Sequence, residues 1–515
     1  MKRDHGWGGF AIRFLVTFSG IFLICDHAPA AQTYYVSKSV GSDQNTATQA
    51  TSKSTPWAHL PGMPSCSSNC KNYTPSPGDT FILMGCDTWV SSDLPVSWDW
   101  SGSSGNPITV TVDHTWYNTT ACPSAWNRPI FDGQLTATGP FLNLSINATR
   151  SYIVFDNIEM KRGTGNSLRY ISCYEQCGYT TVQNMYLHAW NVTTDGNCVI
   201  LAFYGVGNVA QQNIIDGSDA SGASPPGATC YAAYAGLPNM ENNVIHDLAN
   251  GVVGYAAGNP APSSVDIGGN LIYNIRESNG GSHPNAIEIV GGGVTYYIHD
   301  NVIHDLQASG AETLMFGNSG ETDYIWNNVF YNNSVANAPE APQTSGQTGI
   351  SFTAWNNTIA TGNGASCFHN SGQSGAGFTA VTIQNNHCIS TASTAADSTW
   401  AGTAATLTTN VLQTPTVASG QGYTSSETYA YSPASANGST VGVGTNLNGN
   451  CSGSLAGLCN VTQYACTYNS TSETVTCPAN STTGRPPLGA WNVGSYQYPT
   501  SGLPQAPTNL VAVGH

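Results

Sequence analysis

One short phrase recurs along the middle of the chain and constrains the fold more than any other feature. It consists of an apolar residue, two variable residues, an Asn and further apolar residues, and its copies follow each other every 27 to 31 residues. A unit of this length cannot fold alone, so the units are expected to stack into a solenoid. The Asn of the copies are Asn157, Asn184, Asn213, Asn243, Asn270, Asn301, Asn328, Asn357 and Asn386, with Asn410 as the candidate for a tenth.

Composition decides which kind of solenoid this is. Charged residues make up only 8% of the chain, so amphipathic helices would lack the charged side chains of their wet face. Short apolar bursts between turn residues favour strands instead. We therefore expect an all-β fold, a right-handed parallel β-helix with a single-stranded solenoid of about ten or more coils, spaced about 4.8 Å apart. The repeated Asn would then stack into a ladder of side-chain amides.

The period also assigns side chains to faces. Residues three before and two after the Asn are mostly Ile, and these should point into the core. Two outward columns follow from the same register. Two residues before the Asn stand His299, Trp326 and Trp355. Three residues after it stand Asp216, His246, Tyr273, His304 and Tyr331.

The ends of the chain differ from its repetitive middle. Residues 1–30 have a basic start, a short apolar run and a small-x-small site at Ala28-Pro29-Ala30, which predicts a secretory signal peptide. Cys25 leaves a lipoprotein anchor as the alternative. After it we expect an N-terminal cap and first coils over 31–135, the β-helix core over 136–415, C-terminal coils and a disulfide-rich closing region over 416–498, and a Pro-rich tail over 499–515.

Cysteine usage agrees with export. The chain has 15 Cys, and without Cys25 an even number remains. Disulfides are therefore expected, since the spacings lack the paired elements of a zinc site. The local pairs that spacing suggests are Cys66/Cys70, Cys173/Cys177, Cys451/Cys459 and Cys466/Cys477.

The net charge of the chain limits which kinds of partner it can bind. The formal net charge is −16, which argues against nucleic acid because that partner needs clustered Lys and Arg. No segment after the signal is long and apolar enough for a span, so no membrane contact is expected after signal cleavage. The protein is expected to be secreted and extracellular, with the periplasm or the cell surface as alternatives. The oligomeric state stays open.

Five segments near the two ends resemble secreted bacterial right-handed parallel β-helix proteins of the pectate-lyase-like superfamily. They are Thr33–Asp43, Pro56–Leu60, Pro77–Trp89 and Arg128–Gly133 at the start, and Arg485–Tyr498 as the closing phrase. The resemblance spans nearly all of the chain after the signal and implies the β-helix fold and export. It leaves the chemistry open, because the superfamily includes polysaccharide lyases, glycoside hydrolases, epimerases and adhesins.

Reactive side chains concentrate between residues 240 and 333. Glu288 stands between two Ile that should face inward, so its side chain should point outward from a strand, which is costly unless it is solvated, paired or functional. Glycoside hydrolysis needs two carboxyl groups, and Glu312, Asp266 or Asp323 could supply the second. The alternative is that these acids are solvated surface positions and turn caps.

Elimination is the other chemistry that this region allows. It needs a base beside a uronate and a cation for the carboxylate. Arg276 is the candidate for either role, or it pairs with a neighbouring acid. The candidate catalytic residues are Glu288, His283, Arg276, His246, His304 and Glu312. The candidate substrate-binding residues are Trp326, Trp355, His299, Tyr273 and Asn285. The outward column of His299, Trp326 and Trp355 would form a platform for sugar rings unless a loop covers it.

These residues predict a secreted carbohydrate-active protein that cleaves glycosidic bonds of an extracellular polysaccharide in a groove on the β-helix. Hydrolysis is slightly favoured over elimination, because the chain is acidic and Lys is scarce. The alternative is a non-enzymatic glycan-binding, adhesin or matrix protein. No cofactor is certain from the sequence. Ca²⁺ is the candidate cation, since it could bridge an acidic polysaccharide to an acidic protein, but no ligand set converges on it.

Overall fold

The structure is a computed structural model, and residues 31–515 of the chain form one compact unit. The residues it describes are 30–144, 150–173, 177–192, 198–219, 230–256, 258, 260–276, 284–307, 311–333, 339–341, 347–361, 364–370, 377–401, 403–427, 429–461, 467–469, 472, 474–476 and 484–498. Except for Ala30, the predicted signal peptide lies outside these residues, and so does the Pro-rich tail. Within the described residues, no helix has both the length and the apolar character needed to cross a membrane.

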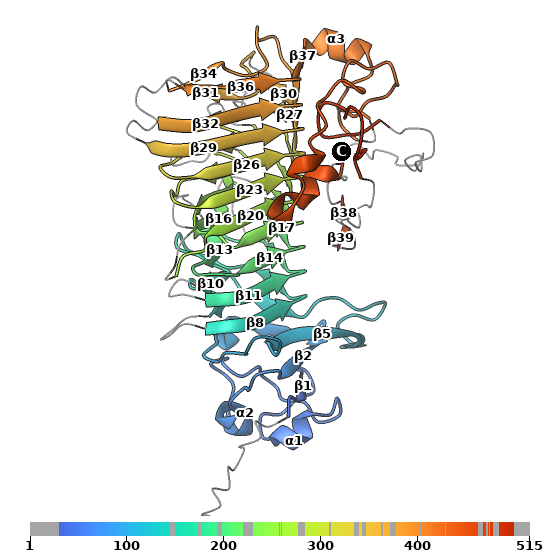
Figure 1. Cartoon of the computed structure of the whole chain (residues 1–515). Helices are drawn as coiled ribbons and strands as arrows, with labels where there is room; N and C mark the ends of the chain where they lie inside the picture. Colours follow the sequence, from blue (N-terminus) through green and yellow to red (C-terminus); the bar gives the residue numbers. More distant parts are fainter. Residues whose placement is uncertain are drawn as a thin grey trace, which may run out of the picture. The chain divides into compact units, whose positions relative to one another are not determined.

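Three parallel sheets run along the unit and confirm the parallel β-helix (Figure 1). Sheet A consists of β1 (Thr33–Val36), β2 (Thr80–Gly85), β5 (Ile108–Tyr117), β8 (Arg150–Asp156), β11 (Cys177–Gln183), β14 (Val209–Gln211), β17 (Asn239–Glu241), β20 (Ser264–Gly268), β23 (Thr295–His299), β26 (Thr322–Trp326), β29 (Thr348–Trp355), β32 (Gly377–Gln384) and β36 (Thr406–Thr408).

Sheets B and C complete each coil. Sheet B consists of β3 (Thr88–Val90), β6 (Ile130–Asp132), β9 (Glu159–Lys161), β12 (Tyr186–His188), β15 (Ile214–Asp216), β18 (Val244–His246), β21 (Leu271–Tyr273), β24 (Val302–His304), β27 (Val329–Asn333), β30 (Thr358–Thr361), β33 (His387–Ile389) and β37 (Val411–Gln413). Sheet C consists of β4 (Val96–Ser97), β7 (Leu142–Asn143), β10 (Ile171–Cys173), β13 (Val199–Phe203), β16 (Tyr231–Gly236), β19 (Asn250–Tyr255), β22 (Ile287–Ile289), β25 (Leu314–Met315), β28 (Glu340–Ala341) and β31 (His369–Asn370).

A few short elements lie outside these sheets. The helices are α1 (Ala47–Ala50), α2 (Ser68–Asn72) and α3 (Pro415–Gly420), with 3-10 turns at Ser91–Asp93, Asn448–Asn450 and Gly453–Cys459. The two small antiparallel hairpins are β34 (Thr399–Trp400) with β35 (Thr403–Ala404), and β38 (Thr467–Asn469) with β39 (Thr474–Thr476).

The predicted asparagine ladder lies at the corner where sheet A passes into sheet B. It runs through Asn213, Asn243, Asn270, Asn301, Asn328, Asn357, Asn386 and Asn410. At each step the amide of one Asn donates to Oδ1 of the next, at 2.9 to 3.0 Å. These side-chain amides connect successive coils. Each bond satisfies a buried donor and a buried acceptor that would otherwise have one partner fewer.

Two of the predicted ladder residues were placed wrongly. Asn157 and Asn184 lie one position earlier in the corner, where the backbone takes the left-handed conformation, with φ of 65° and 55°. Asn tolerates that conformation better than most residues. The ladder position in their coils is held by Ile158 and Met185, and Asn213 Oδ1 accepts a bond from the Met185 backbone at 3.0 Å. The amide ladder therefore starts at Asn213.

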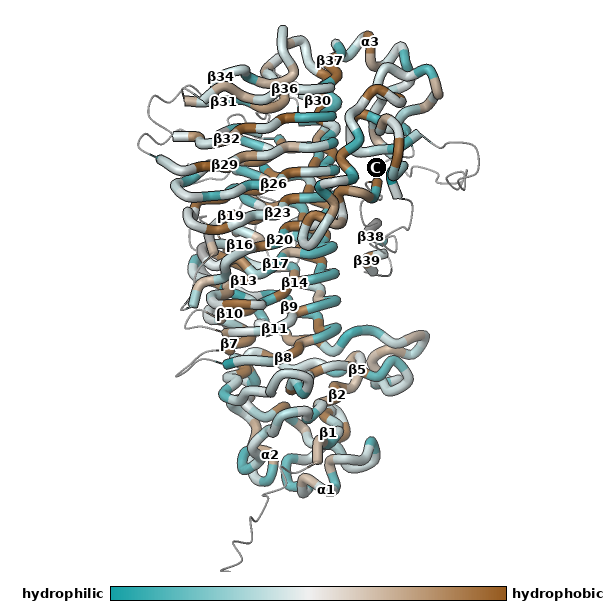
Figure 2. The backbone as a smooth tube through the Cα atoms, viewed as in Figure 1, coloured by the Kyte–Doolittle hydropathy of each residue, from teal (hydrophilic) through white to brown (hydrophobic). Residues whose placement is uncertain are grey.

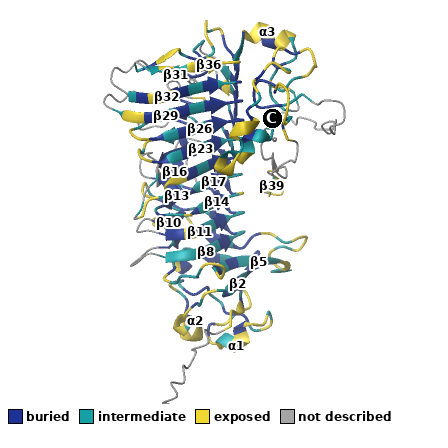
Figure 3. Ribbon diagram, viewed as in Figure 1, coloured by how far each residue is buried: buried dark blue, intermediate teal, exposed yellow. Residues whose placement is uncertain are grey.

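The predicted inward columns form the core. Ile267, Ile298 and Ile325 on sheet A and Ile245 and Ile303 on sheet B are all fully buried. Apolar and polar residues alternate along the strands (Figure 2), and the buried residues follow the stacked strands while exposed ones gather in the connections (Figure 3). This alternation is the expected consequence of a strand with one face against the core.

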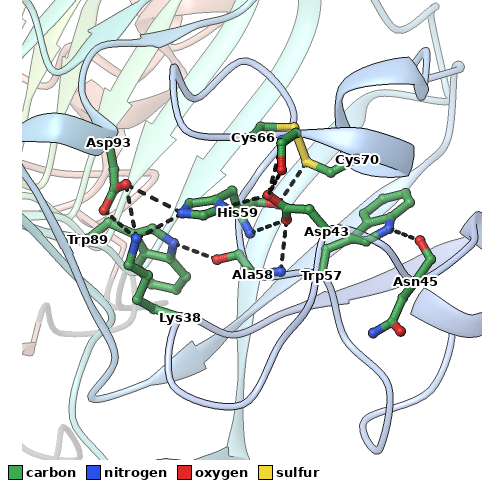
Figure 4. The surroundings of a disulfide bond; sticks show 11 residues. Lys38, Asp43, Asn45, Trp57, Ala58, His59, Cys66, Cys70, Trp89 and Asp93 are labelled. Atoms are coloured by element: carbon green, nitrogen blue, oxygen red, sulfur yellow. Dashed lines mark hydrogen bonds and ion pairs between the residues drawn. A yellow bond between two sulfur atoms is a disulfide. The ribbon is translucent and has the colours of Figure 1, made fainter.

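The N-terminal cap closes the first coil with aromatic rings and one buried carboxylate (Figure 4). Trp57 stacks on Tyr34 at 5.1 Å. Asp43 accepts hydrogen bonds from the backbone of Ala58 and Ser67, at 3.1 and 3.0 Å, and bonds His59 Nδ1 at 2.7 Å. One carboxylate thus joins three separate turns of the cap.

The C-terminal segment, residues 440–498, folds back on the β-helix along the ladder corner. The buried Arg485 donates through Nη2 to Asn327 Oδ1 at 2.9 Å. Asn356 donates to the Asn492 carbonyl at 3.0 Å, and Asn385 donates to the Thr445 carbonyl at 2.8 Å. These left-handed corner residues therefore anchor the segment over the coils of β26, β29 and β32.

Six disulfides join described cysteines. Three predicted pairs, Cys66–Cys70, Cys173–Cys177 and Cys451–Cys459, are confirmed. The structure adds Cys86–Cys122, Cys198–Cys230 and Cys367–Cys388, which sequence spacing alone does not indicate. The predicted pair Cys466/Cys477 lies outside the described residues.

Candidate active site

The predicted site residues are divided among the three sheets rather than gathered in one groove. His299, Trp326 and Trp355 lie on sheet A, and Glu288 lies on sheet C beside Asn285 and Glu312. His246, Tyr273 and His304 lie on sheet B, with Arg276 in the connection that follows β21. His283 lies outside the described residues. Each sheet therefore has to be assessed by itself.

The sheet A group is covered, so its predicted role as a sugar platform is wrong. Trp326 is fully buried and Trp355 is 8% exposed. Both pack against Leu447, Leu458 and Trp491 of the C-terminal segment. The sequence places these rings outward correctly, but a segment more than 90 residues later in the chain lies on top of them.

His299 has a structural role on the same sheet. Its Nε2 lies 3.0 Å from Asp266 and its Nδ1 lies 2.8 Å from Asp300, while its ring stacks on Trp326 at 4.4 Å. Burial lowers the pKa of His299, but its bonds with the two carboxylates outweigh burial and raise that pKa to about 10. His299 is therefore a cation at neutral pH whose two nitrogens are both occupied.

On sheet C, two predicted residues are parts of the scaffold. Asn285 is fully buried, and its Oδ1 accepts a hydrogen bond from the Glu312 backbone at 2.8 Å. Its own backbone donates to Asn250 Oδ1 at 3.2 Å. Glu312 is only 5% exposed. The predicted substrate-binding role of Asn285 is wrong, because it joins successive coils from within.

Glu288 keeps its predicted outward position on β22, half-buried, with Oε2 accepting from Asn285 Nδ2 at 2.7 Å. Two of its three proposed carboxylate partners are elsewhere: Asp323 is fully buried on β26, and Asp266 bonds His299 on sheet A. The third, Glu312, lies nearby on sheet C but is buried. Sequence analysis missed another carboxylate, Glu340, that could act with Glu288. Glu288 is paired with Met315 and Met315 with Glu340, so the two acids lie in one column two coils apart.

The same sheet C column continues into a His–Asp pair that the sequence also missed. His369 is paired with Glu340 on the neighbouring coil, and His369 Nδ1 bonds Asp397 at 2.9 Å. The His369 side chain is 41% exposed. The asparagine register could not reveal this column, because the connections between sheet B and sheet C differ in length from coil to coil.

On sheet B, the predicted column of rings is confirmed, with Tyr331 as its last ring. The ring centroids are 4.8 Å apart from His246 to Tyr273, 5.2 Å from Tyr273 to His304 and 5.0 Å from His304 to Tyr331. All three pairs are stacked, with interplanar angles of 5°, 5° and 21°. His246 and His304 cover the two faces of Tyr273, a predicted substrate-binding residue, so its ring cannot stack on a sugar.

Each His of the column is held by the Asp that follows it. His246 Nδ1 bonds Asp247 at 2.9 Å and His304 Nδ1 bonds Asp305 at 2.7 Å. Both Asp adopt the left-handed conformation, with φ of 58° and 56°, which turns the carboxylate back toward the preceding ring. An ionised carboxylate only accepts hydrogen bonds, so Nδ1 carries a proton in each pair. His246 is buried and its Nε2 lies 3.6 Å from Asp216 Oδ1, whereas the partly exposed His304 can offer its Nε2 for other chemistry.

Arg276 joins this cluster through Asp247. Its Nη2 lies 2.6 Å from Asp247 Oδ1, while its Nε is buried without a hydrogen-bond partner. Burial raises the pKa of Asp247, but bonds with His246 and the charge of Arg276 lower it overall. The hydrogen bond from His304 likewise lowers the pKa of Asp305. Both carboxylates therefore stay ionised at neutral pH.

A second charged group lies upstream on the same sheet. His188 bonds Asp219 through Nδ1 at 2.6 Å and Glu159 through Nε2 at 3.1 Å, and Lys161 bonds Glu159 at 2.7 Å. Burial lowers the pKa of His188, but the two carboxylates raise it overall. Both nitrogens of His188 are occupied, so this group is a structural ion network.

The sheet B cluster can therefore supply a base and a cation side by side. The His304 side chain is 19% exposed, and the Arg276 side chain is 38% exposed. Tyr273, whose ring lies between His246 and His304, belongs to the same coil as Arg276. Among the residues that the structure describes, no group of three or more His, Cys, Asp or Glu is arranged to hold a metal ion.

Comparisons with known proteins give the following findings. No family model and no curated protein matches the chain. Among solved structures, a PL6 family alginate lyase, AlyGC, is 15% identical with a TM-score of 0.38, covering 61% of this chain and 42% of that one. The chain thus spans less than half of that enzyme. Pectate lyase Pel9A is 14% identical with a TM-score of 0.39, covering 90% and 96%.

A third solved structure carries a different enzyme name. The GH136 lacto-N-biosidase from Eubacterium ramulus is 9% identical with a TM-score of 0.32, covering 74% of this chain and 68% of that one. At such TM-scores none of these likenesses bears on the reaction, which has to be argued from the geometry of the site.

Proposed function

We propose that the protein is a polysaccharide-cleaving enzyme that acts on a uronate-containing polysaccharide by elimination on the outer face of sheet B. The observation that carries the proposal is the His304–Asp305 pair. Asp305 holds His304 Nδ1 at 2.7 Å, which leaves Nε2 as a base. One coil away, Arg276 is bound by Asp247 on one side only.

The elimination assigns a role to each of these groups. His304 Nε2 takes the proton from the sugar carbon beside the carboxylate, and that electron pair forms the new C=C bond. The glycosidic C–O bond breaks, and the leaving oxygen takes a proton. Arg276 neutralises the uronate carboxylate, which makes the proton more acidic. Bidentate binding of a carboxylate is a strength of the guanidinium group.

Tyr331 is our candidate for the donor of the proton to the leaving oxygen. Its ring stacks on His304 at 5.0 Å. Burial, with the charges of Asp305 and Tyr431, raises the pKa of Tyr331 to about 12. Its hydroxyl therefore stays protonated at neutral pH, which a proton donor needs.

Hydrolysis on sheet C is the second candidate, and one observation favours it. Glu288 and Glu340 lie in one column two coils apart, so their Cα atoms are separated by roughly 9–10 Å. Glycoside hydrolases that invert the sugar hold their two carboxyl groups about 6.5–9.5 Å apart. Reducing ends without unsaturated product would select this site.

The test is incubation of the protein with a panel of acidic and neutral polysaccharides. Elimination produces reducing ends together with near-ultraviolet absorbance from the unsaturated sugar, whereas hydrolysis produces reducing ends alone. We expect His304→Gln to lower the elimination rate at least 100-fold. We expect Glu288→Gln and the control His114→Gln, an exposed His on β5, to leave that rate unchanged.

Three results would contradict the proposal. One is full activity of His304→Gln, and another is loss of activity in Glu288→Gln alone. The third is binding of a polysaccharide without any product, which would support the non-enzymatic alternative. Circular dichroism of each variant separates loss of chemistry from loss of fold.

A further inference from the structure

A cavity lies on the outer face of sheet B beyond the end of the ring column. Its volume is about 360 Å³. The column of aromatic rings stops at Tyr331, because the next two coils carry Ala360 and Ile389, which are paired with each other. Both residues line the cavity. The smaller side chain of Ala360 therefore leaves room where the ring column would otherwise continue.

Helix α3 and the segment that follows it form the other wall. Pro415 and Ser419 come from α3, and Tyr423 and Tyr431 come from the segment after it. The Tyr423 hydroxyl is fixed by Thr440 at 2.7 Å. The ring centroids of Tyr431 and Tyr331 are 5.9 Å apart, so this wall of the cavity lies next to the last ring of the column.

The cavity is lined for a neutral polar ligand. Its polar wall includes the amides of Asn332 and Asn333 and the hydroxyls of Thr361 and Ser425. None of the described residues that line it is charged. Pockets with aromatic walls and a few polar groups are typical of small-molecule sites, and the volume falls within their usual range of about 300–1,000 Å³.

One lining group has a donor that the protein does not use. Asn333 is 2% exposed, and its Oδ1 accepts a hydrogen bond from the Leu306 backbone at 3.0 Å. Its Nδ2 is buried without a hydrogen-bond partner. Burial of an amide donor without a partner is unfavourable, so a ligand hydroxyl or ring oxygen that accepts from Asn333 Nδ2 would gain from that bond.

An acidic side chain behind the wall disfavours an acidic ligand. Glu427 accepts hydrogen bonds from the Thr424 backbone at 3.1 Å and from Ser432 at 3.3 Å. Thr424 lines the cavity, whereas Glu427 lies behind it. Burial already raises the pKa of Glu427 to about 7, and a uronate carboxylate beside it would find no cation among the described lining residues.

We propose that this cavity binds a neutral sugar residue of the same polysaccharide, so that the substrate is a heteropolymer of uronic acid and neutral sugars. This inference rests on the proposed function. Ala360 lies two coils beyond His304, roughly 10 Å away along the sheet. The neutral residue is therefore about two sugar units from the uronate that is attacked.

Binding of single sugars tests the cavity without any cleavage. The probes are neutral hexoses and 6-deoxyhexoses, with galacturonate and mannuronate as acidic probes, titrated by nuclear magnetic resonance into the His304→Gln protein. We expect at least one neutral sugar to bind at millimolar concentration and the uronates to bind at least 10-fold more weakly. Equal binding of the uronates, or no binding of any neutral sugar, would overturn the inference.

Two variants locate the binding. Ala360→Trp fills the cavity and should weaken the neutral sugar at least 10-fold, whereas Ala380→Trp, at an exposed Ala on β32, should not. Asn333→Asp keeps the acceptor for Leu306 but removes the unused donor, and should weaken binding several-fold. Unchanged affinity in both cavity variants would overturn the inference.

Cleavage assays distinguish a failure of this inference from a failure of the proposed function. With active protein, Ala360→Trp should raise KM for a mixed polysaccharide about 10-fold while leaving a pure polyuronate unaffected. Sugar binding without any elimination by the active protein would refute the lyase and keep the cavity. Equal cleavage of mixed and pure polymers, both insensitive to Ala360→Trp, would refute the cavity and keep the lyase.

Discussion

Replacing Asn301 with Ala should test how strongly the buried ladder holds neighbouring coils together. Its Oδ1 accepts from the Asn270 backbone and side chain, at 3.0 and 2.9 Å, and its Nδ2 donates to the Ile267 carbonyl at 2.8 Å and to Asn328 Oδ1 at 3.0 Å. The Asn328 oxygen keeps its bond from the Asn301 backbone at 3.0 Å. The substitution therefore leaves three buried polar groups short of a partner.

Each unsatisfied buried group costs about 1–3 kcal/mol, so Asn301→Ala should lower the free energy of unfolding by about 4 kcal/mol. Urea unfolding followed by tryptophan fluorescence measures the loss, and hydrogen exchange at residues 267–273 localises it. The control Asn437→Ala, at an exposed position, should change stability by less than about 0.5 kcal/mol. Asn410→Ala, at the half-buried end of the ladder, should fall between the two. A loss below about 1 kcal/mol in Asn301→Ala would refute the reasoning.

Two further predictions concern the outer faces. Burial lowers the pKa of His299, but Asp266 and Asp300 raise it from 6.5 to about 10, so its stabilisation is present below pH 6.5 and lost as the pH rises through 10. The melting temperature should fall between pH 7 and 10, and the fall should be smaller in His299→Gln; parallel pH profiles for the two proteins would contradict this. Gly217→Ala would place a Cβ against the Asp247 carbonyl oxygen and should disturb the Arg276 cluster, lowering cleavage several-fold with KM raised. Unchanged kinetics in that variant would show that the Asp247 backbone can move freely.

The faces of sheets A and B could be predicted because the corner between them has a constant length. From β8 to β36, two residues separate each sheet A strand from the sheet B strand that follows. One Asn position therefore fixes both columns, and the ring stack of His246, Tyr273 and His304 follows directly. The error at Asn157 and Asn184 has a simple cause. Both corner positions favour Asn, one for its amide and the other for its left-handed conformation.

Sheet C could not be aligned from the sequence in the same way. The connection from β21 to β22 spans residues 274–286, whereas that from β24 to β25 spans 305–313. That Glu340 and His369 share a column with Glu288 is therefore visible in the structure but not in the sequence. The covering of sheet A by the C-terminal segment could not be predicted either. Periodicity tells that Trp326 points outward, but it does not tell that residues between 447 and 491 pack against it.

Our proposal of elimination rests on a local charge, that of Arg276, whereas the sequence-based preference for hydrolysis rests on the net charge of the whole chain. The net charge of −16 favours hydrolysis of a neutral polymer if every charge acts on the substrate. At physiological salt, however, exposed charges farther than about 8 Å are largely screened. A uronate on sheet B would be governed by Arg276, whose Nε is unpartnered, more than by acids on distant coils. Loss of uronate cleavage in Arg276→Gln, with only a small recovery in Arg276→Lys, would show that the guanidinium geometry decides the substrate; equal activity of the two variants would show that it does not.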